Sequence, residues 1–75
     1  MFPGVKATKL LAILLREPLA YEIVRQKGSH RVLRAEGRSP ILFSFHDSAT
    51  VAPGLVRKIL VRDAGLSEEE ALKLL

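Results

Sequence analysis

The fold is decided by residues 21–45, which read YEIVRQKGSHRVLRAEGRSPILFSF. Residues typical of β-strands fill three runs of this segment, namely 21–26, 30–35 and 41–45. Gly28-Ser29 and Glu36-Gly37 supply turn residues between the runs. Three consecutive strands joined by short connections predict an antiparallel meander.

Helical patterns flank the three strands. We expect a first helix over residues 8–16, capped by Thr8 and ended by Pro18, which lacks the backbone N–H that a helix needs. Its buried face has the i, i+3, i+4 spacing and comprises Leu10, Ile13 and Leu14. Leu11 and Leu15 form a second apolar row, which a small domain has difficulty burying and which predicts a partner helix or a homodimer contact.

Two further helices follow the strands. Pro53 suits the first turn of the second helix and Gly65 suits the position just beyond its end. Ser67 and Glu70 have the spacing of a capping box, which predicts a short C-terminal helix. The sequence therefore predicts an α+β fold in one domain over residues 1–75, with the helices on one face of a three-stranded sheet and the other face free for a ligand.

Composition and charge restrict the function classes. The chain has no cysteine and two histidines, so neither a disulfide framework nor a structural zinc site is expected. No segment reads as a signal peptide or membrane span, which predicts a soluble, cytoplasmic protein without a membrane contact. Residues 1–62 hold eleven Lys or Arg against four acids, whereas residues 63–75 hold one against four. Such a basic surface is typical of proteins that bind nucleic acid.

The candidate chemistry centres on His30. Histidine titrates near neutral pH and can act as a general base, and Arg25, Lys27 and Arg31 are cations close to it in sequence. Attack of an RNA 2′-hydroxyl on the neighbouring phosphate needs such a base and positive charge, and it needs no metal or cofactor. Ser29 and the backbone N–H groups around Gly28 would donate hydrogen bonds to phosphate oxygens. The alternative is an ordinary hairpin turn with an exposed histidine.

The segment from Tyr21 to His30, followed by Pro53-Gly54, Leu60 and Ala64-Gly65-Leu66-Ser67, resembles the HicA (YcfA-like) toxins of HicA–HicB toxin–antitoxin pairs. The resemblance implies an α-β-β-β-α fold similar to a double-stranded-RNA-binding domain. It also implies a stress-response toxin that cleaves mRNA with one histidine, here His30, and that a HicB-like antitoxin neutralises.

Several assignments remain open from the sequence. His46 is either a general acid for the leaving oxygen or a solvated residue at a strand end. A basic stripe on the second helix, formed by Arg57, Lys58 and Arg62, either contacts RNA or an acidic antitoxin, or is simply solvated. The rival functions are a non-catalytic module that binds double-stranded RNA and a protein-interaction domain that uses the apolar first helix.

Overall fold

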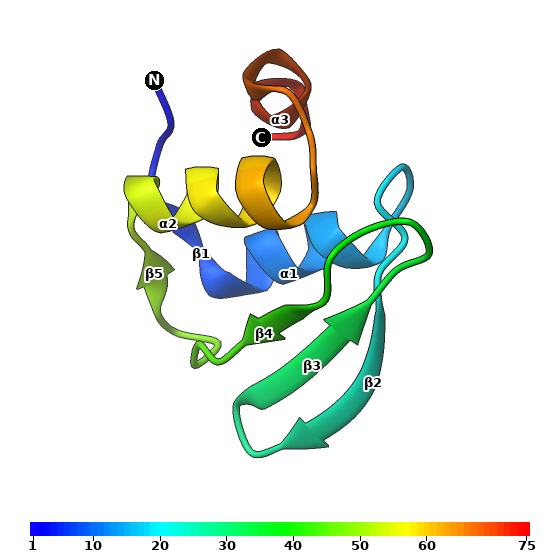
Figure 1. Ribbon diagram of the computed structural model, residues 1–75. Coiled ribbons are helices and arrows are strands. Elements are labelled where there is room, and N and C mark those ends of the chain that lie inside the picture. The colour runs from blue at the N-terminus through cyan, green and yellow to red at the C-terminus, as the bar shows by residue number, and fades with distance from the viewer.

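The computed structural model describes residues 1–75, and Figure 1 shows its elements. In chain order they are β1 (Val5–Lys6), α1 (Ala7–Leu15), β2 (Glu22–Lys27), β3 (His30–Arg34), β4 (Ile41–Phe43), β5 (Thr50–Val51), α2 (Pro53–Arg57), η1 (Lys58–Asp63) and α3 (Glu68–Leu74). The helices gather on one side of the β2–β3–β4 sheet (Figure 1). The predicted α+β fold with an α-β-β-β-α arrangement, like that of a double-stranded-RNA-binding domain, is thus confirmed.

The three-stranded sheet is an antiparallel meander in the order β2–β3–β4, as predicted. Its first hairpin turns at Gly28, whose φ of +61° lies in the left-handed region that favours glycine. A register shift between Ile23 and Arg25 places a β-bulge at Val24. No residue of β2 is buried, because the hairpin projects away from the helices (Figure 1).

The core between sheet and helices consists of apolar side chains and Tyr21, and it contains no charged side chain. Leu10, Ile13 and Leu14 of α1 are buried as predicted, and they lie in one cluster with Leu33 and Phe43 of the sheet. Because no charged side chain is buried in this core, all the residues proposed for chemistry lie at or near the surface.

The second helix begins with Pro53 in its first turn and continues from α2 into η1, a stretch of π-helix. Gly65 follows its end with φ of +84°, as its predicted position requires. Ser67 and Glu70 form both hydrogen bonds of the predicted capping box at the start of α3.

Three details of the prediction were wrong. The first helix begins at Ala7 with Lys6 as its N-cap, so Thr8 lies inside it and caps nothing. The strand bounds also differ: the first strand covers Glu22–Lys27 instead of residues 21–26, the second ends at Arg34 instead of residue 35, and the third ends at Phe43 instead of residue 45. The antiparallel pair of β1 and β5 was missed altogether, and it accounts for the earlier helix start because Lys6 pairs with Thr50.

The second apolar row of α1 is largely covered. Leu11 packs against the core and only Leu15 is exposed. The Lys9 Nζ lies 3.1 Å from the Leu75 carbonyl oxygen, which places the end of the chain against α1. The uncovered leucine row that the sequence predicted is therefore reduced to one side chain.

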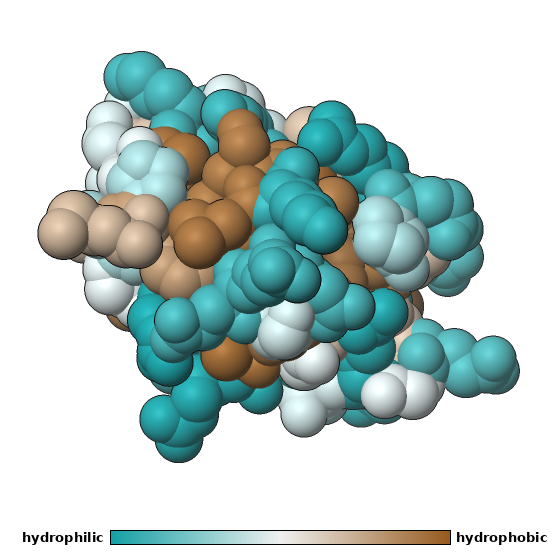
Figure 2. All heavy atoms as spheres, turned by 90° about the horizontal axis from the view of Figure 1, so that it is seen from above, coloured by the Kyte–Doolittle hydropathy of each residue, from teal (hydrophilic) through white to brown (hydrophobic).

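The two ends of the molecule differ in character. Viewed from the side of α3 and α2, apolar side chains gather in the middle of the surface and hydrophilic ones surround them (Figure 2). The opposite end is formed by the β2–β3 hairpin (Figure 1). None of the helices has both the length and the apolar character that crossing a lipid bilayer demands.

Candidate functional site

His30 is the first residue of β3, directly after the Gly28-Ser29 turn, and its side chain is exposed. It pairs across the hairpin with Lys27. Neither nitrogen of its imidazole makes a hydrogen bond within the protein. The ring is therefore free to exchange a proton with a ligand that approaches the hairpin.

The sheet has an inner face toward the helices and an outer face toward solvent. Leu33, Ile41 and Phe43 are buried and define the inner face. Alternation along the strands and the cross-strand pairs then assign seven residues to the outer face. These are Glu22, Arg25, Lys27, His30, Val32, Arg34 and Leu42.

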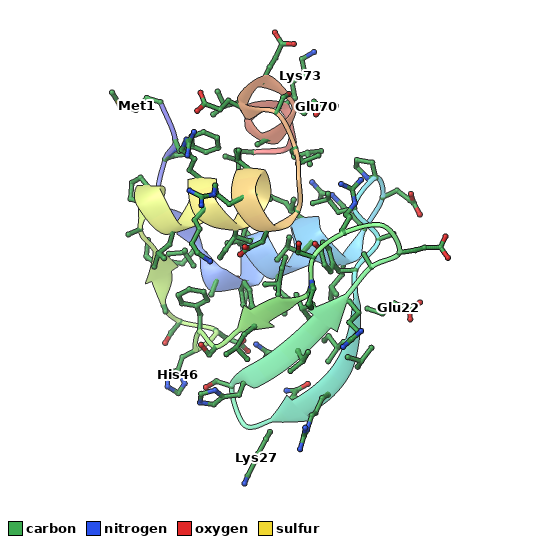
Figure 3. The ribbon with its side chains drawn as sticks, in the orientation of Figure 1. Met1, Glu22, Lys27, His46, Glu70 and Lys73 are labelled. Atoms are coloured by element: carbon green, nitrogen blue, oxygen red, sulfur yellow. The ribbon has the colours of Figure 1, made fainter.

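The outer face brings His30 together with two of the predicted phosphate-binding cations. Arg25 pairs with Val32, and Lys27 pairs with His30, so both side chains rise from the same face as the imidazole. Lys27 projects from the tip of the hairpin (Figure 3). One acid, Glu22, lies at the far end of this face, where it pairs with Arg34. The surface around the imidazole is therefore positively charged.

The turn itself is held by Gln26, which is not among the predicted site residues. The Nε2 of Gln26 donates a hydrogen bond to the Gly28 carbonyl oxygen over 3.2 Å. The carbonyl of Gly28 is thereby engaged, while Gly28 and Ser29 remain at the surface of the hairpin tip. Both residues lie in the turn between Lys27 and His30.

Arg31 is separated from this cluster although it follows His30 directly. It pairs with Phe43 on the inner face, and its side chain is only 13% exposed. Its Nη2 lies 3.3 Å from Oδ1 of Asp47, on the loop after β4, while Nη1 is buried without a hydrogen-bond partner. Arg31 cannot reach a phosphate on the outer face without leaving Asp47.

The cations of the second helix are also apart from His30. Arg57 donates to Oε2 of Glu68 over 2.9 Å from Nε and 2.6 Å from Nη2, and Lys58 lies 3.1 Å from Oδ2 of Asp63. These ion pairs compensate both charges, and α2 lies on the helical side of the sheet, away from the hairpin tip (Figure 1). Of the basic stripe, only Arg62 forms no ion pair.

His46, the second histidine, lies on the loop between β4 and β5 and is exposed. Figure 3 shows it at the same end of the molecule as Lys27, far from Glu70 and Lys73 on α3. Nowhere do three carboxylate, imidazole or thiol groups converge as they would around a metal ion.

A hollow lies at the other end of the sheet. It has a volume of about 510 Å³ and is lined by residues that include Pro18, Glu22, Arg34 and Arg38. Arg38 is committed to the fold, because its Nη1 donates to the Ala64 carbonyl oxygen at the end of the second helix over 2.7 Å. The hollow contains neither histidine, so acid–base chemistry with imidazole is confined to the hairpin end.

Comparison with known proteins identifies the family of the chain. Neither the curated proteins nor the solved structures include a match to the chain. The family described as "HicA toxin of bacterial toxin-antitoxin" matches residues 8–66, which span α1, the whole sheet and the second helix. This range also includes every residue of the outer face. The chain therefore belongs to the HicA toxin family of bacterial toxin–antitoxin systems.

Proposed function

We propose that this chain is an endoribonuclease toxin that cleaves mRNA in the cytoplasm, with His30 as the general base. The observation that carries the proposal is an exposed imidazole, free of hydrogen bonds within the protein, on the same sheet face as Arg25 and Lys27. In this reaction His30 takes the proton of a ribose 2′-hydroxyl, and the oxygen then attacks the adjacent phosphorus. Lys27 and Arg25 stabilise the negative charge that develops on the phosphate oxygens.

The reaction proceeds without a metal in this proposal, because the nucleophile is a hydroxyl of the substrate and the base is a side chain. A positioned general base is worth on the order of 10²–10⁴ in rate. We therefore expect a slow nuclease, which suffices for a toxin because few cuts inactivate a message.

The test compares the purified protein with His30→Ala on a single-stranded RNA in the presence of a chelator. We expect cleavage by the wild type, and a loss of on the order of 10²-fold or more in the variant. Ser48→Ala is the matched control, because Ser48 is an exposed residue elsewhere at the same end of the molecule and only its backbone carbonyl is engaged. Equal cleavage by wild type and His30→Ala would show that His30 is not the base.

A second experiment distinguishes the rival function, a non-catalytic module that binds RNA. The fold resembles a double-stranded-RNA-binding domain, so a non-catalytic module would bind duplex RNA through its cations. Retention of duplex RNA in a gel shift, without strand scission by the wild type over hours, would favour that module over the nuclease.

We further propose that a HicB-like antitoxin inhibits the toxin by covering the outer face of the sheet. Support comes from the mixture of groups on this face. Leu42 is 64% exposed beside Val32, and cations flank both residues. An acidic protein surface with an apolar centre fits this pattern. Leu42→Asp should therefore weaken binding of the antitoxin while the variant remains folded. A pull-down at fixed salt would measure this binding.

Homodimer formation through Leu11 and Leu15 is not part of the proposal. Stable interfaces bury on the order of 1,000 Å² or more, and one exposed leucine offers a small fraction of that area.

A further inference from the structure

An ion pair joins the two segments that carry histidines. Arg31 follows His30 on β3, and Asp47 follows His46 on the loop after β4. The Arg31 Nη2 and the Asp47 Oδ1 are 3.3 Å apart. Because the bonded residues are the direct neighbours of the histidines, the ion pair holds the His46 loop against the first residues of β3.

Backbone hydrogen bonds close the loop on the other side of His46. The Ala49 N–H donates to the His46 carbonyl oxygen over 2.9 Å and forms a tight turn. The Ala7 N–H donates to the Ala49 carbonyl oxygen, also over 2.9 Å, which fixes the turn to the start of α1. His46 thus stands at the beginning of a turn that is anchored at both ends, and its side chain points into solvent at the hairpin end of the molecule (Figure 3).

Strand cleavage by a 2′-hydroxyl requires two proton transfers. One base removes the hydroxyl proton as the bond from O2′ to phosphorus forms. One acid protonates the 5′-oxygen as its bond to phosphorus breaks, since an alkoxide is a poor leaving group. Lysine and arginine beside His30 hold their protons too firmly for this task, whereas an imidazole exchanges its proton near neutral pH.

We propose that His46 is this general acid, an inference that rests on the nuclease function proposed above. The scissile phosphate lies between the hairpin and the loop. His30 accepts the 2′-proton, and the imidazolium of His46 gives its proton to O5′. The products are a 2′,3′-cyclic phosphate and a 5′-hydroxyl. The enzyme ends with His30 protonated and His46 neutral, and solvent restores both.

Arg31 and Asp47 are then positioning residues, because they act through the loop and do not touch the substrate. This role accounts for a cation that lies next to the catalytic base in sequence but turns to the opposite face of the sheet.

The test uses two substrates that differ in the leaving group. The first is a dinucleotide of RNA, whose 5′-oxygen needs a proton. The second is a uridine 3′-(4-nitrophenyl phosphate), whose nitrophenolate leaves without one. We expect His46→Ala to lose on the order of 100-fold on the dinucleotide and much less, within about threefold, on the aryl ester. His30→Ala should lose activity on both substrates, because both need the base.

Asp47→Ala tests the positioning role. It should lower cleavage of the dinucleotide more than that of the aryl ester. In the double variant with His46→Ala it should cause little further loss of activity, because both changes affect one proton transfer. Ser48→Ala, on the same loop, is the control and should match the wild type on both substrates.

Two outcomes overturn the inference while the nuclease proposal stands. Unchanged dinucleotide cleavage by His46→Ala would exclude the role, and equal losses on both substrates would show that the loop serves binding or folding instead. If the wild type cleaves neither these two substrates nor the single-stranded RNA, the nuclease proposal itself fails and this inference fails with it.

Discussion

His30 and Arg31 are neighbours in sequence with opposite roles, because successive side chains of a strand point to opposite faces. His30 lies on the outer face with Lys27, and Arg31 lies on the inner face with Asp47. The prediction from the sequence placed both residues near a phosphate, because it grouped the cations by their distance along the chain. Alternation alone was enough to separate them, whereas the ion pair with Asp47, 16 residues away, had no signal in the sequence.

Tyr21 illustrates how one buried polar group secures the start of the sheet. Its hydroxyl donates to the Ser39 carbonyl oxygen over 2.8 Å, and burial raises the pKa of Tyr21 above 10.0. We expect Tyr21→Phe to lower the free energy of unfolding by about 1 kcal/mol, since the carbonyl loses its partner. Urea denaturation at neutral pH measures the change. Ser39→Ala keeps the backbone carbonyl and should unfold like the wild type.

The raised pKa of Tyr21 determines how the free energy of unfolding changes at alkaline pH. The folded state favours the protonated phenol, so its contribution is complete below pH 10 and is lost as the pH rises through the raised pKa. Tyr21→Phe should therefore show a weaker loss of stability above pH 10. An identical alkaline slope in both proteins would contradict this assignment.

Gly28 and Gly54 make a matched pair for testing the hairpin turn. A Cβ would meet no atom within 4 Å at either position, but only Gly28 has a positive φ, of +61°. We expect Gly28→Ala to destabilise the fold by about 1 kcal/mol through backbone strain. Gly54→Ala should be neutral or stabilising, because alanine favours the helix. Thermal or urea unfolding of both variants decides the question, and equal effects would mean that the turn is free to change its conformation.

The capping box of α3 provides an acid-sensitive contact. The hydrogen bond that the Ser67 backbone N–H donates to the Glu70 carboxylate lowers the pKa of Glu70 below its usual 4.5, and a smaller contribution comes from the Ser67 side chain. The ionised carboxylate is favoured in the folded state, so its contribution is present above pH 4.5 and is lost as the pH falls through the lowered pKa. Glu70→Gln should flatten the decline of stability in acid, as urea midpoints at several pH values would show.

Ser67→Ala removes the other half of the same box. The Glu70 N–H then loses the Ser67 hydroxyl, to which it donates over 3.0 Å, and we expect a cost of about 1 kcal/mol at neutral pH. A cost near zero would indicate that α3 is held by its packing alone.

Local patterns predicted the elements whose signals lie within a few residues. The turn at Gly28, the proline of α2 and the capping box of α3 are of this kind, and all three are confirmed. The strands β1 and β5 have two residues each, too few for any periodicity, and they pair across 44 to 46 residues of chain. Leu11 likewise looked unpartnered because the core against which it packs is formed by residues from other parts of the chain.

Some cations of the protein are paired with acids, and others are not. Arg57 and Lys58 of the second helix are compensated by Glu68 and Asp63, while Arg25 and Lys27 on the outer face have no such partner. Binding of RNA releases counterions in proportion to the phosphates contacted by free cations. The salt dependence of binding therefore reports which end of the molecule meets the RNA.

We expect Lys27→Ala, made in a His30→Ala background that cannot cut the RNA, to reduce the slope of log K against log salt by about 0.7, the value for one contact to single-stranded RNA. Arg57→Ala should change the slope by less than half as much, because Glu68 already neutralises that side chain. Fluorescence anisotropy at several salt concentrations gives the slopes.

Lys73→Ala, which removes an exposed cation on α3 at the far end of the molecule (Figure 3), is the control and should leave the slope unchanged. A slope that responds to Arg57→Ala as strongly as to Lys27→Ala would move the RNA path from the outer face of the sheet to the second helix.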